Sequence, residues 1–228
     1  MAWAAHYIGK TYRDYYLNGQ MLAEAQLKVA DDFGFDQVSA ISDPWRESSA
    51  YGMEFEYPED SVGVPKAHLI TGLKDIEQLR LIDPFSDARL RDRLEAIKIM
   101  FGQSAGRYSV LGWIEGPLAQ YSDLRGLQNA LVDLIETPEW FEKASERMVE
   151  NAKRFARAQI ECGADMIGVG DAAASLIGPE LYDKYVFPWH KQLFASIHQM
   201  GAKVKLHICG NIGSLMPLLV HTGADIID

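Results

Sequence analysis

A histidine and a cysteine near the end of the sequence, His207 and Cys209, have the types and spacing that best suit catalytic chemistry. They lie at the end of the segment 204–208, Val-Lys-Leu-His-Ile, which is predicted to form a β-strand. Residues two apart on a strand point to the same face. Imidazole nitrogen and thiolate sulfur both bind Zn²⁺ well, and a catalytic zinc takes about three protein ligands and keeps one open position. The pair therefore predicts two ligands of a zinc site.

The same pair also has a purely structural interpretation. His207 would then be a hydrogen-bonded residue at a strand end, and Cys209 would be a small buried hydrophobic residue. Gly210 and Asn211 favour the metal site, because they let the backbone turn sharply and expose the thiol. The other cysteine, Cys162, stands at the expected end of a helix, which indicates a structural thiol. Two cysteines are too few for a disulfide framework.

Two aspartates, Asp43 and Asp171, form a second group of candidates, since each follows a predicted strand. In a closed ring of strands both carboxylates would face the mouth, where barrel enzymes place their active sites. Each could act as a base, a cation anchor or a substrate contact, and the alternative for each is a turn or helix-capping role. His6 would join them if 2–5 forms the first strand. Otherwise His6 is an exposed or capping histidine.

The elements that position these residues alternate between strands and helices. Strands are predicted at 37–41, 108–114, 166–169, 204–208 and 224–228, and a small hairpin within 53–70. Helices are predicted over 12–33, in two pieces within 75–101, over 138–162 and 180–200, and from 214. This alternation predicts an α/β protein with a parallel sheet.

We expect one domain over 1–228, a (β/α)8 TIM barrel present as a truncated fragment of about six βα units. We expect about two units to be missing at the C-terminal end, with an incomplete N-terminal end as a further alternative.

Composition and charge exclude several classes of protein. The chain has 228 residues, of which 48% are hydrophobic, enough for one substantial core. A net charge of -10 and a pI near 5.1 argue against binding to nucleic acid or to an anionic membrane surface. The sequence has neither a signal peptide nor an apolar run approaching the roughly 20 residues of a membrane span. We therefore expect a cytoplasmic protein.

Two long segments, 163–189 and 205–228, resemble the second half of proteins of the uroporphyrinogen decarboxylase superfamily. The shared features are Gly-Ala-Asp before a strand, a Gly-Pro turn, Phe-Pro, and the run His-x-Cys-Gly-Asn. The resemblance extends back through Gly116-Pro117 and the segment 9–15, over nearly the whole chain. This superfamily comprises decarboxylases of uroporphyrinogen and zinc-dependent methyltransferases that exchange methyl groups with corrinoid proteins.

The sequence departs from the decarboxylases at three places. Their Arg-Gln-Ala-Gly-Arg stretch, whose arginines meet the carboxylates of the substrate, matches 6–10 here, where His6 and Lys10 stand instead. Neither imidazole nor a point-charge ammonium replaces a bidentate guanidinium at a carboxylate site. Their active-site tyrosine falls near Asp123, and their serine after the fourth strand falls at Ala172. These departures favour the methyltransferase branch.

The resemblance to that branch implies that His207 and Cys209 bind zinc, with a third ligand beyond Asp228. Zinc would convert a bound thiol to a thiolate or polarise a methyl-bearing oxygen. Asp43, Asp171 and His6 would line the pocket, and a small methyl donor or a thiol or folate acceptor would exchange methyl groups with a corrinoid held by a partner protein.

Other interpretations stay open at this point. One is a uroporphyrinogen decarboxylase that uses an aspartate such as Asp43, and another is a non-catalytic relative that binds a corrinoid or a porphyrin. A homodimer is one alternative for the assembly.

Overall fold

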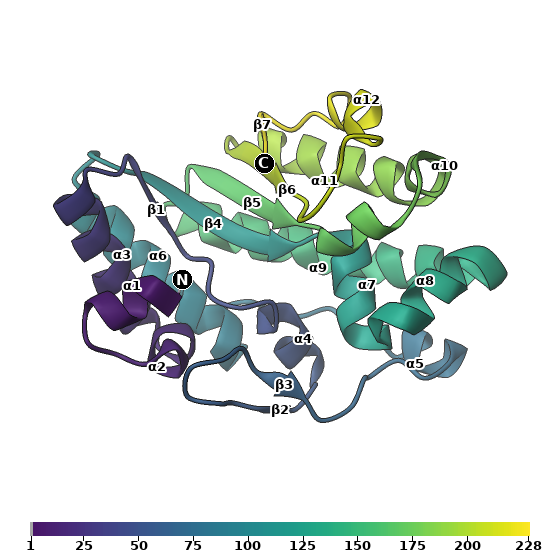
Figure 1. Cartoon of the computed structure of the whole chain (residues 1–228), viewed down its shortest axis with the longest axis horizontal. Helices are drawn as coiled ribbons and strands as arrows, with labels where there is room; N and C mark the ends of the chain where they lie inside the picture. The colour runs from purple at the N-terminus through teal and green to yellow at the C-terminus, as the bar shows by residue number, and fades with distance from the viewer. Residues whose placement is uncertain (1) are drawn as a thin grey trace.

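The computed structural model describes residues 2–228, which form a five-stranded parallel sheet with its crossover helices (Figure 1). Its strands are β1 (Gln37–Ser39), β4 (Ser109–Glu115), β5 (Met166–Gly170), β6 (Lys203–His207) and β7 (Ile226–Ile227). They are adjacent in that order, and every pair is parallel. Helical crossovers between sequential neighbours are the arrangement of a (β/α)-barrel wall. The α/β class predicted from the sequence is confirmed.

Five helices alternate with these strands: α3 (Gly19–Phe33), α6 (Ala88–Ser104), α9 (Pro138–Glu161), α11 (Phe187–Gln199) and α12 (Met216–Leu219). The remaining helices are α1 (Ala2–Tyr7), α2 (Tyr12–Leu17), α4 (Arg46–Tyr51), α5 (Leu73–Glu77), α7 (Pro117–Arg125), α8 (Leu127–Glu136) and α10 (Pro179–Leu181). A 3-10 segment η1 (Ala172–Leu176) follows β5, and a π-helical segment η2 (Tyr182–Val186) precedes α11. None of the helices in residues 2–228 is long and apolar enough to cross a membrane.

The first strand considered as one alternative at 2–5 does not form, because this segment belongs to helix α1, and the parallel sheet of the described residues has five strands. Alanine occupies three of these positions and has the highest helix propensity of any residue. Ala4 and Ala5 are buried. The hairpin expected within 53–70 is confirmed by the antiparallel pair of β2 (Phe55–Glu56) and β3 (Val64–Pro65).

Two helices expected to be continuous are interrupted for local reasons. Asn18 divides 12–33 into α2 and α3, because its backbone is extended and its side chain accepts a hydrogen bond from the N–H of Met21, which caps α3. The helix expected over 180–200 widens into the π-helical segment η2 directly before Pro188. Proline has no N–H to donate to the preceding turn, so a regular helix cannot continue through it.

The register of the sheet aligns the ends of three strands. Glu115 pairs with Gly170, and Gly170 pairs with His207, so the two side chains lie on the same face of the sheet on either side of a glycine. The opposite face packs against α9, where the Gln159 side chain bonds to both the N–H and the C=O of Trp113 at 2.7 and 3.0 Å. The face with Glu115 and His207 is therefore the one turned away from α9.

Candidate functional site

His207 and Cys209 lie next to each other at the carboxyl end of β6, as the strand spacing predicted. The Nε2 atom of His207 is 3.0 Å from the Sγ atom of Cys209, and its Nδ1 atom is 2.9 Å from Oδ1 of Asp228. An aspartate that accepts from Nδ1–H leaves Nε2 with a lone pair directed at the thiol. The ring also packs near Trp113, with 6.0 Å between ring centroids. The imidazole is therefore oriented on two sides.

These atoms suit a zinc ion, although they are too few for a complete site. One imidazole nitrogen and one sulfur are typical zinc ligands, and a carboxylate on the second ring nitrogen is the usual partner of a metal-binding histidine. Cys209 is exposed and Cys162 is buried, so the two thiols differ in access as expected. Within residues 2–228, no group of three His, Cys, Asp or Glu side chains could hold a metal ion. The described residues thus offer two ligands, and their role as zinc ligands stays a prediction.

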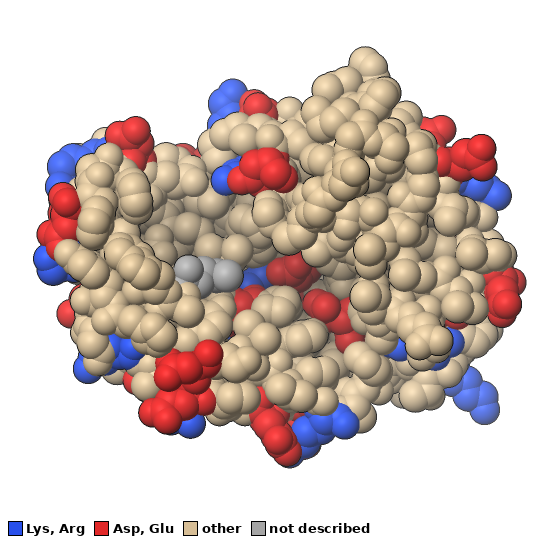
Figure 2. Space-filling model, in the orientation of Figure 1, with Lys and Arg blue, Asp and Glu red and all other residues tan. Residues whose placement is uncertain are grey.

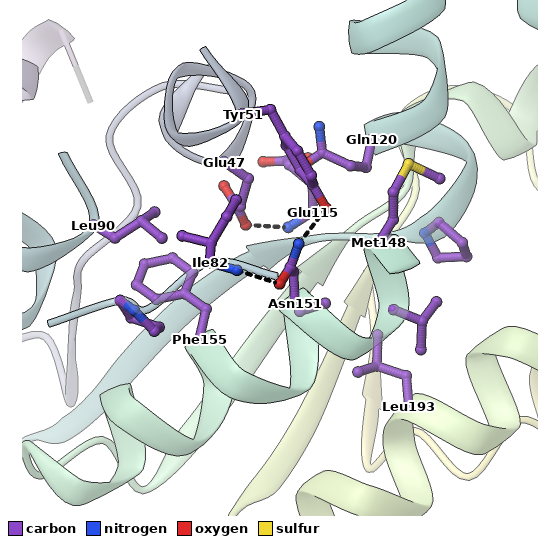
Figure 3. A pocket seen from close by; sticks show the side chains of 15 residues that line it. Glu47, Tyr51, Ile82, Leu90, Glu115, Gln120, Met148, Asn151, Phe155 and Leu193 are labelled. Atoms are coloured by element: carbon purple, nitrogen blue, oxygen red, sulfur yellow. Dashed lines mark hydrogen bonds between the residues drawn. The ribbon is translucent and has the colours of Figure 1, made fainter. Parts of the chain in front are cut away.

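Beside the end of β4 lies a buried group of charges around Arg46. Figure 3 shows two of its members, Glu47 and Glu115. Arg46 on α4 is 1% exposed, and its Nη2 atom is 2.6 Å from Oε1 of Glu115. Its Nε atom is 3.4 Å from Oε2 of Glu47, whose other oxygen accepts from the N–H of Glu115 at 2.9 Å. Burial raises the pKa of Glu115 to about 8 against the opposing effect of Arg46, and it raises the pKa of Glu47 too. One guanidinium therefore serves two buried carboxyl groups whose pKa values are both raised.

The structure places Asp43 in a second buried ion pair, next to the first. Its carboxylate pairs with Arg89 and accepts hydrogen bonds from the hydroxyl of Ser42 at 2.7 Å and from the N–H of Trp45 at 2.9 Å. Burial opposes ionisation, but Arg89 and Arg46 outweigh it and hold the pKa of Asp43 below its ordinary value. Asp43 is thus a fixed, ionised carboxylate in the turn after β1.

Asp171, after β5, is fully buried and caps helix α7. Its Oδ1 atom accepts from the N–H of Ala119 at 2.7 Å, and Oδ2 accepts from the N–H of Leu118 at 3.4 Å. A carboxylate at a helix N-terminus is favoured by the free N–H groups and the helix dipole. The backbone N–H of Asp171 also donates to the carbonyl of His207 at 2.9 Å. Asp171 therefore ties α7 to the strand that ends at His207.

Two further buried side chains, His190 and Tyr182, complete this contact, and sequence analysis did not single them out. The Nε2 atom of His190 lies 2.8 Å from Oδ2 of Asp171, and its Nδ1 atom lies 2.8 Å from the hydroxyl of Tyr182. All three residues have no exposed surface. Eight residues span about 12 Å along a regular helix, so helical spacing does not predict that Tyr182 and His190 meet.

His6 is not brought to this region of the molecule. It lies on α1, its side chain is 54% exposed, and its Nε2 atom is 2.8 Å from Oδ1 of Asp60. It does not line the pocket between α7, η1 and the loop around Trp45. The first-strand position that would have directed His6 to the mouth of the barrel does not form, since the segment is helical.

A pocket of about 470 Å³ opens at the carboxyl ends of the strands, between α7, η1 and the loop around Trp45. Its lining includes Trp45, His68, Ser122, Asp123, Ser175 and Leu176. A methyl group on Gly210 would lie 3.2 Å from the Ser175 hydroxyl, so the loop that carries Cys209 borders this pocket. Figure 2 shows a hollow near the middle of this face of the molecule, with acidic and basic side chains on its floor. The pocket and the His207–Cys209 pair therefore form one region.

Asp123 is the acidic residue of this pocket, and sequence reasoning noted it only as the position of a decarboxylase tyrosine. Its Oδ2 atom is buried and has no hydrogen-bond partner among the described residues. Burial is the main cause that raises its pKa well above the ordinary value, and the carboxyl groups of Glu115 and Glu47 add to it. Asp123 therefore holds its proton more tightly than an exposed aspartate does.

Comparison with known proteins gives the chain its family. The model of the uroporphyrinogen decarboxylase (URO-D) family matches residues 3–228. The chain belongs to the URO-D family. The predicted membership is thereby confirmed, and the region described above occupies the carboxyl ends of the strands of a URO-D family domain.

Relatives within the family differ in activity. The chain is 28% identical over 214 residues to the uroporphyrinogen decarboxylase of Carboxydothermus hydrogenoformans, covering 91% of this chain and 60% of that protein. It is also 28% identical over 211 residues to the methylcobamide:CoM methyltransferase MtbA of Methanosarcina acetivorans, covering 90% of this chain and 60% of the relative. The chain thus spans about three fifths of the length of these relatives. The family members are enzymes, decarboxylases or methyltransferases.

A solved structure supports the fold. A methyltransferase from Methanosarcina mazei superposes with a TM-score of 0.90 at 22% sequence identity, over 100% of this chain and 67% of that chain. The prediction of part of a TIM barrel is confirmed, with helices packed on one face of a parallel sheet.

Proposed function

We propose that this protein is a zinc-dependent methyltransferase that moves a methyl group between a small donor or acceptor and a corrinoid held by a partner protein. The observation that carries the proposal is the contact between His207 Nε2 and Cys209 Sγ at 3.0 Å, with Asp228 on the other ring nitrogen. When bound there, zinc would supply a Lewis acid that turns a thiol into a thiolate or polarises a methyl-bearing oxygen.

The residues of this chain would hold and orient that centre. Asp228 keeps the imidazole in the tautomer that presents Nε2, and Trp113 packs beside the ring. Asp171 acts as a positioning residue, because its backbone N–H bonds to the carbonyl of His207 and its side chain caps α7. Asp43 acts through its ion pair with Arg89, which fixes the turn after β1. His6 has no part in this proposal, because it lies on α1 and does not line the pocket.

The charge of the pocket argues against uroporphyrinogen decarboxylation, the second candidate. A substrate with many carboxylates needs cationic partners. Among the described residues, no lysine or arginine lines the pocket, whereas the acidic residue Asp123 does. Arg46 and Arg89 lie close by, but both are already paired with carboxylates of this chain. Because the chain is similar to the decarboxylase of C. hydrogenoformans, the experiments below also test this second candidate.

Metal analysis tests the proposal without requiring a known substrate. After dialysis, the full-length protein should retain close to one zinc ion per chain, and its Cys209→Ser variant should lose it. Cys162→Ser is the matched control, because Cys162 is buried at the end of α9 and should leave the zinc content unchanged. Equal zinc content in the wild type and Cys209→Ser, or none in either, would contradict the proposal.

Activity assays separate the remaining alternatives. Turnover of uroporphyrinogen by metal-free protein would establish the decarboxylase instead. Tight binding of a corrinoid or porphyrin, with no turnover of any methyl donor or porphyrinogen, would establish a non-catalytic relative.

A further inference from the structure

The pocket beside Asp123 has an unusual balance of polar groups. Two of its polar side-chain atoms, Oδ2 of Asp123 and the hydroxyl oxygen of Ser122, are buried and have no hydrogen-bond partner among the described residues. A buried polar atom without a partner costs roughly 1–3 kcal/mol, and a bound ion or water is one of the explanations for such atoms in native proteins. Both residues belong to the lining of this pocket.

A third polar group of the pocket is an acceptor. The Nδ1 atom of His68 lies 3.1 Å from the backbone carbonyl of Asp123, and a carbonyl oxygen can only accept, so Nδ1 carries the hydrogen. In the neutral imidazole, Nε2 is then an acceptor on a ring that lines the pocket. Acceptors therefore predominate once Asp123 is ionised, and they call for a ligand that donates hydrogen bonds.

The surroundings of Asp123 favour a positively charged donor. The charged groups that act on it are Glu115 from β4, Glu47 and Arg46 from α4, and Asp171 from the turn after β5. With Asp123 itself, four acidic groups face one guanidinium. A cation that enters the pocket offsets this excess of acidic groups, because it favours the ionised form of Asp123 over the protonated form.

The rest of the wall is apolar. Trp45, Leu127, Leu176 and three alanines surround the polar groups. Aromatic and aliphatic side chains cover the hydrocarbon part of a ligand, and the face of an indole also attracts organic cations. A hydrated metal ion would gain nothing from such a wall, whereas an ammonium ion with a hydrocarbon substituent would use both parts of the pocket.

We propose that this pocket binds a small organic ammonium ion, whose N–H groups donate to Asp123 and to the neighbouring acceptors while its hydrocarbon part packs against Trp45, Leu127 and Leu176. The inference concerns binding alone and requires neither zinc nor methyl transfer. Burial raises the pKa of Asp123 in the empty pocket, and a bound cation favours the carboxylate, so binding should lower this pKa and release protons wherever Asp123 is protonated in the free protein.

Calorimetry with benzylammonium tests this inference, with benzyl alcohol as an uncharged probe of nearly the same shape. The wild type should bind benzylammonium and should bind benzyl alcohol at least tenfold more weakly. The affinity for benzylammonium should rise with pH, by up to about tenfold per pH unit, while Asp123 is protonated in the free protein. Titrations in buffers with different enthalpies of ionisation should report a release of protons when benzylammonium binds.

Substitutions assign the effect to Asp123. Asp123→Asn keeps the shape of the side chain and should weaken benzylammonium binding at least tenfold, with the proton release abolished. Asp183→Asn is the matched control, since Asp183 is exposed on η2 and outside the pocket. It should bind as the wild type does. Thermal unfolding of each variant verifies that it is folded.

Three results would overturn the inference. They are no binding of benzylammonium at millimolar concentration, equal affinity of the wild type and Asp123→Asn, and binding of benzyl alcohol as tight as that of the cation. None of these depends on the zinc analysis, so failure of the methyltransferase proposal and failure of this inference are distinguishable.

Discussion

The carboxylate of Asp171 lies directly against Gly116: a methyl group added to this glycine would be 2.6 Å from Oδ2 and 2.7 Å from Cβ of Asp171. Gly116 immediately precedes α7, whose N–H groups bond to the same carboxylate. Its φ of −73° is one that any residue can adopt. Position 116 therefore requires a glycine because there is no space for a side chain, not because of its backbone conformation.

Gly116→Ala should destabilise the protein by about 1–3 kcal/mol, because the new methyl group must displace the buried cap of α7. Gly178→Ala is a closely matched control. Gly178 also precedes a proline at the start of a helix, with a φ of −74°, but a methyl group there meets nothing within 4 Å. It should be neutral or stabilising by up to about 1 kcal/mol. Urea denaturation measures both; equal effects would show that the contact with Asp171 carries no weight.

Arg46→Met should destabilise the protein by about 3–5 kcal/mol at pH 8, because Glu115 and Glu47 would be buried without their cation. The loss should be smaller at pH 5, where both carboxyl groups can be protonated. Lys143→Met removes an exposed pair with Glu77 and should change the free energy of unfolding by no more than about 1 kcal/mol. A pH-independent loss for Arg46→Met would mean that packing, not charge, is the cause.

The free energy of unfolding should fall as pH rises from about 5 to 8. The pKa of Glu115 is about 8 in the folded protein against roughly 4.3 in an unfolded chain, so the folded state binds more protons in this interval. One such group contributes at most about 1.4 kcal/mol per pH unit. The stability that it provides is complete below the unfolded pKa and is lost as pH rises through the folded one.

Glu115→Gln should therefore flatten the fall in stability between pH 5 and pH 8. The matched control is Glu146→Gln, at an exposed position of α9, which should leave the slope unchanged. Guanidinium denaturation at several pH values gives the slope for each variant. An unchanged slope in Glu115→Gln would assign the proton uptake to Glu47 and Asp123 instead.

The local pattern of the sequence determined the alternation of strands and helices, and it placed His207 and Cys209 together. This succeeded because residues two apart on a strand share a face whatever surrounds them. The local pattern did not decide the structure of 2–5, because a short alanine-rich segment fits either a strand or a helix. Packing against α2 and α3 favours the helix there.

Only the tertiary structure decided what the acidic residues do. Asp43 and Asp171 both follow strands, as predicted, but Arg89 and His190 come to them from helices 46 and 19 residues away. Asp123 stood out in the sequence only as the position of a decarboxylase tyrosine, and its raised pKa comes first from burial and then from Glu115 and Glu47 on other elements. The charge state of a carboxyl group depends on the water and charges within a few ångströms, and the fold, not the neighbouring sequence, sets these.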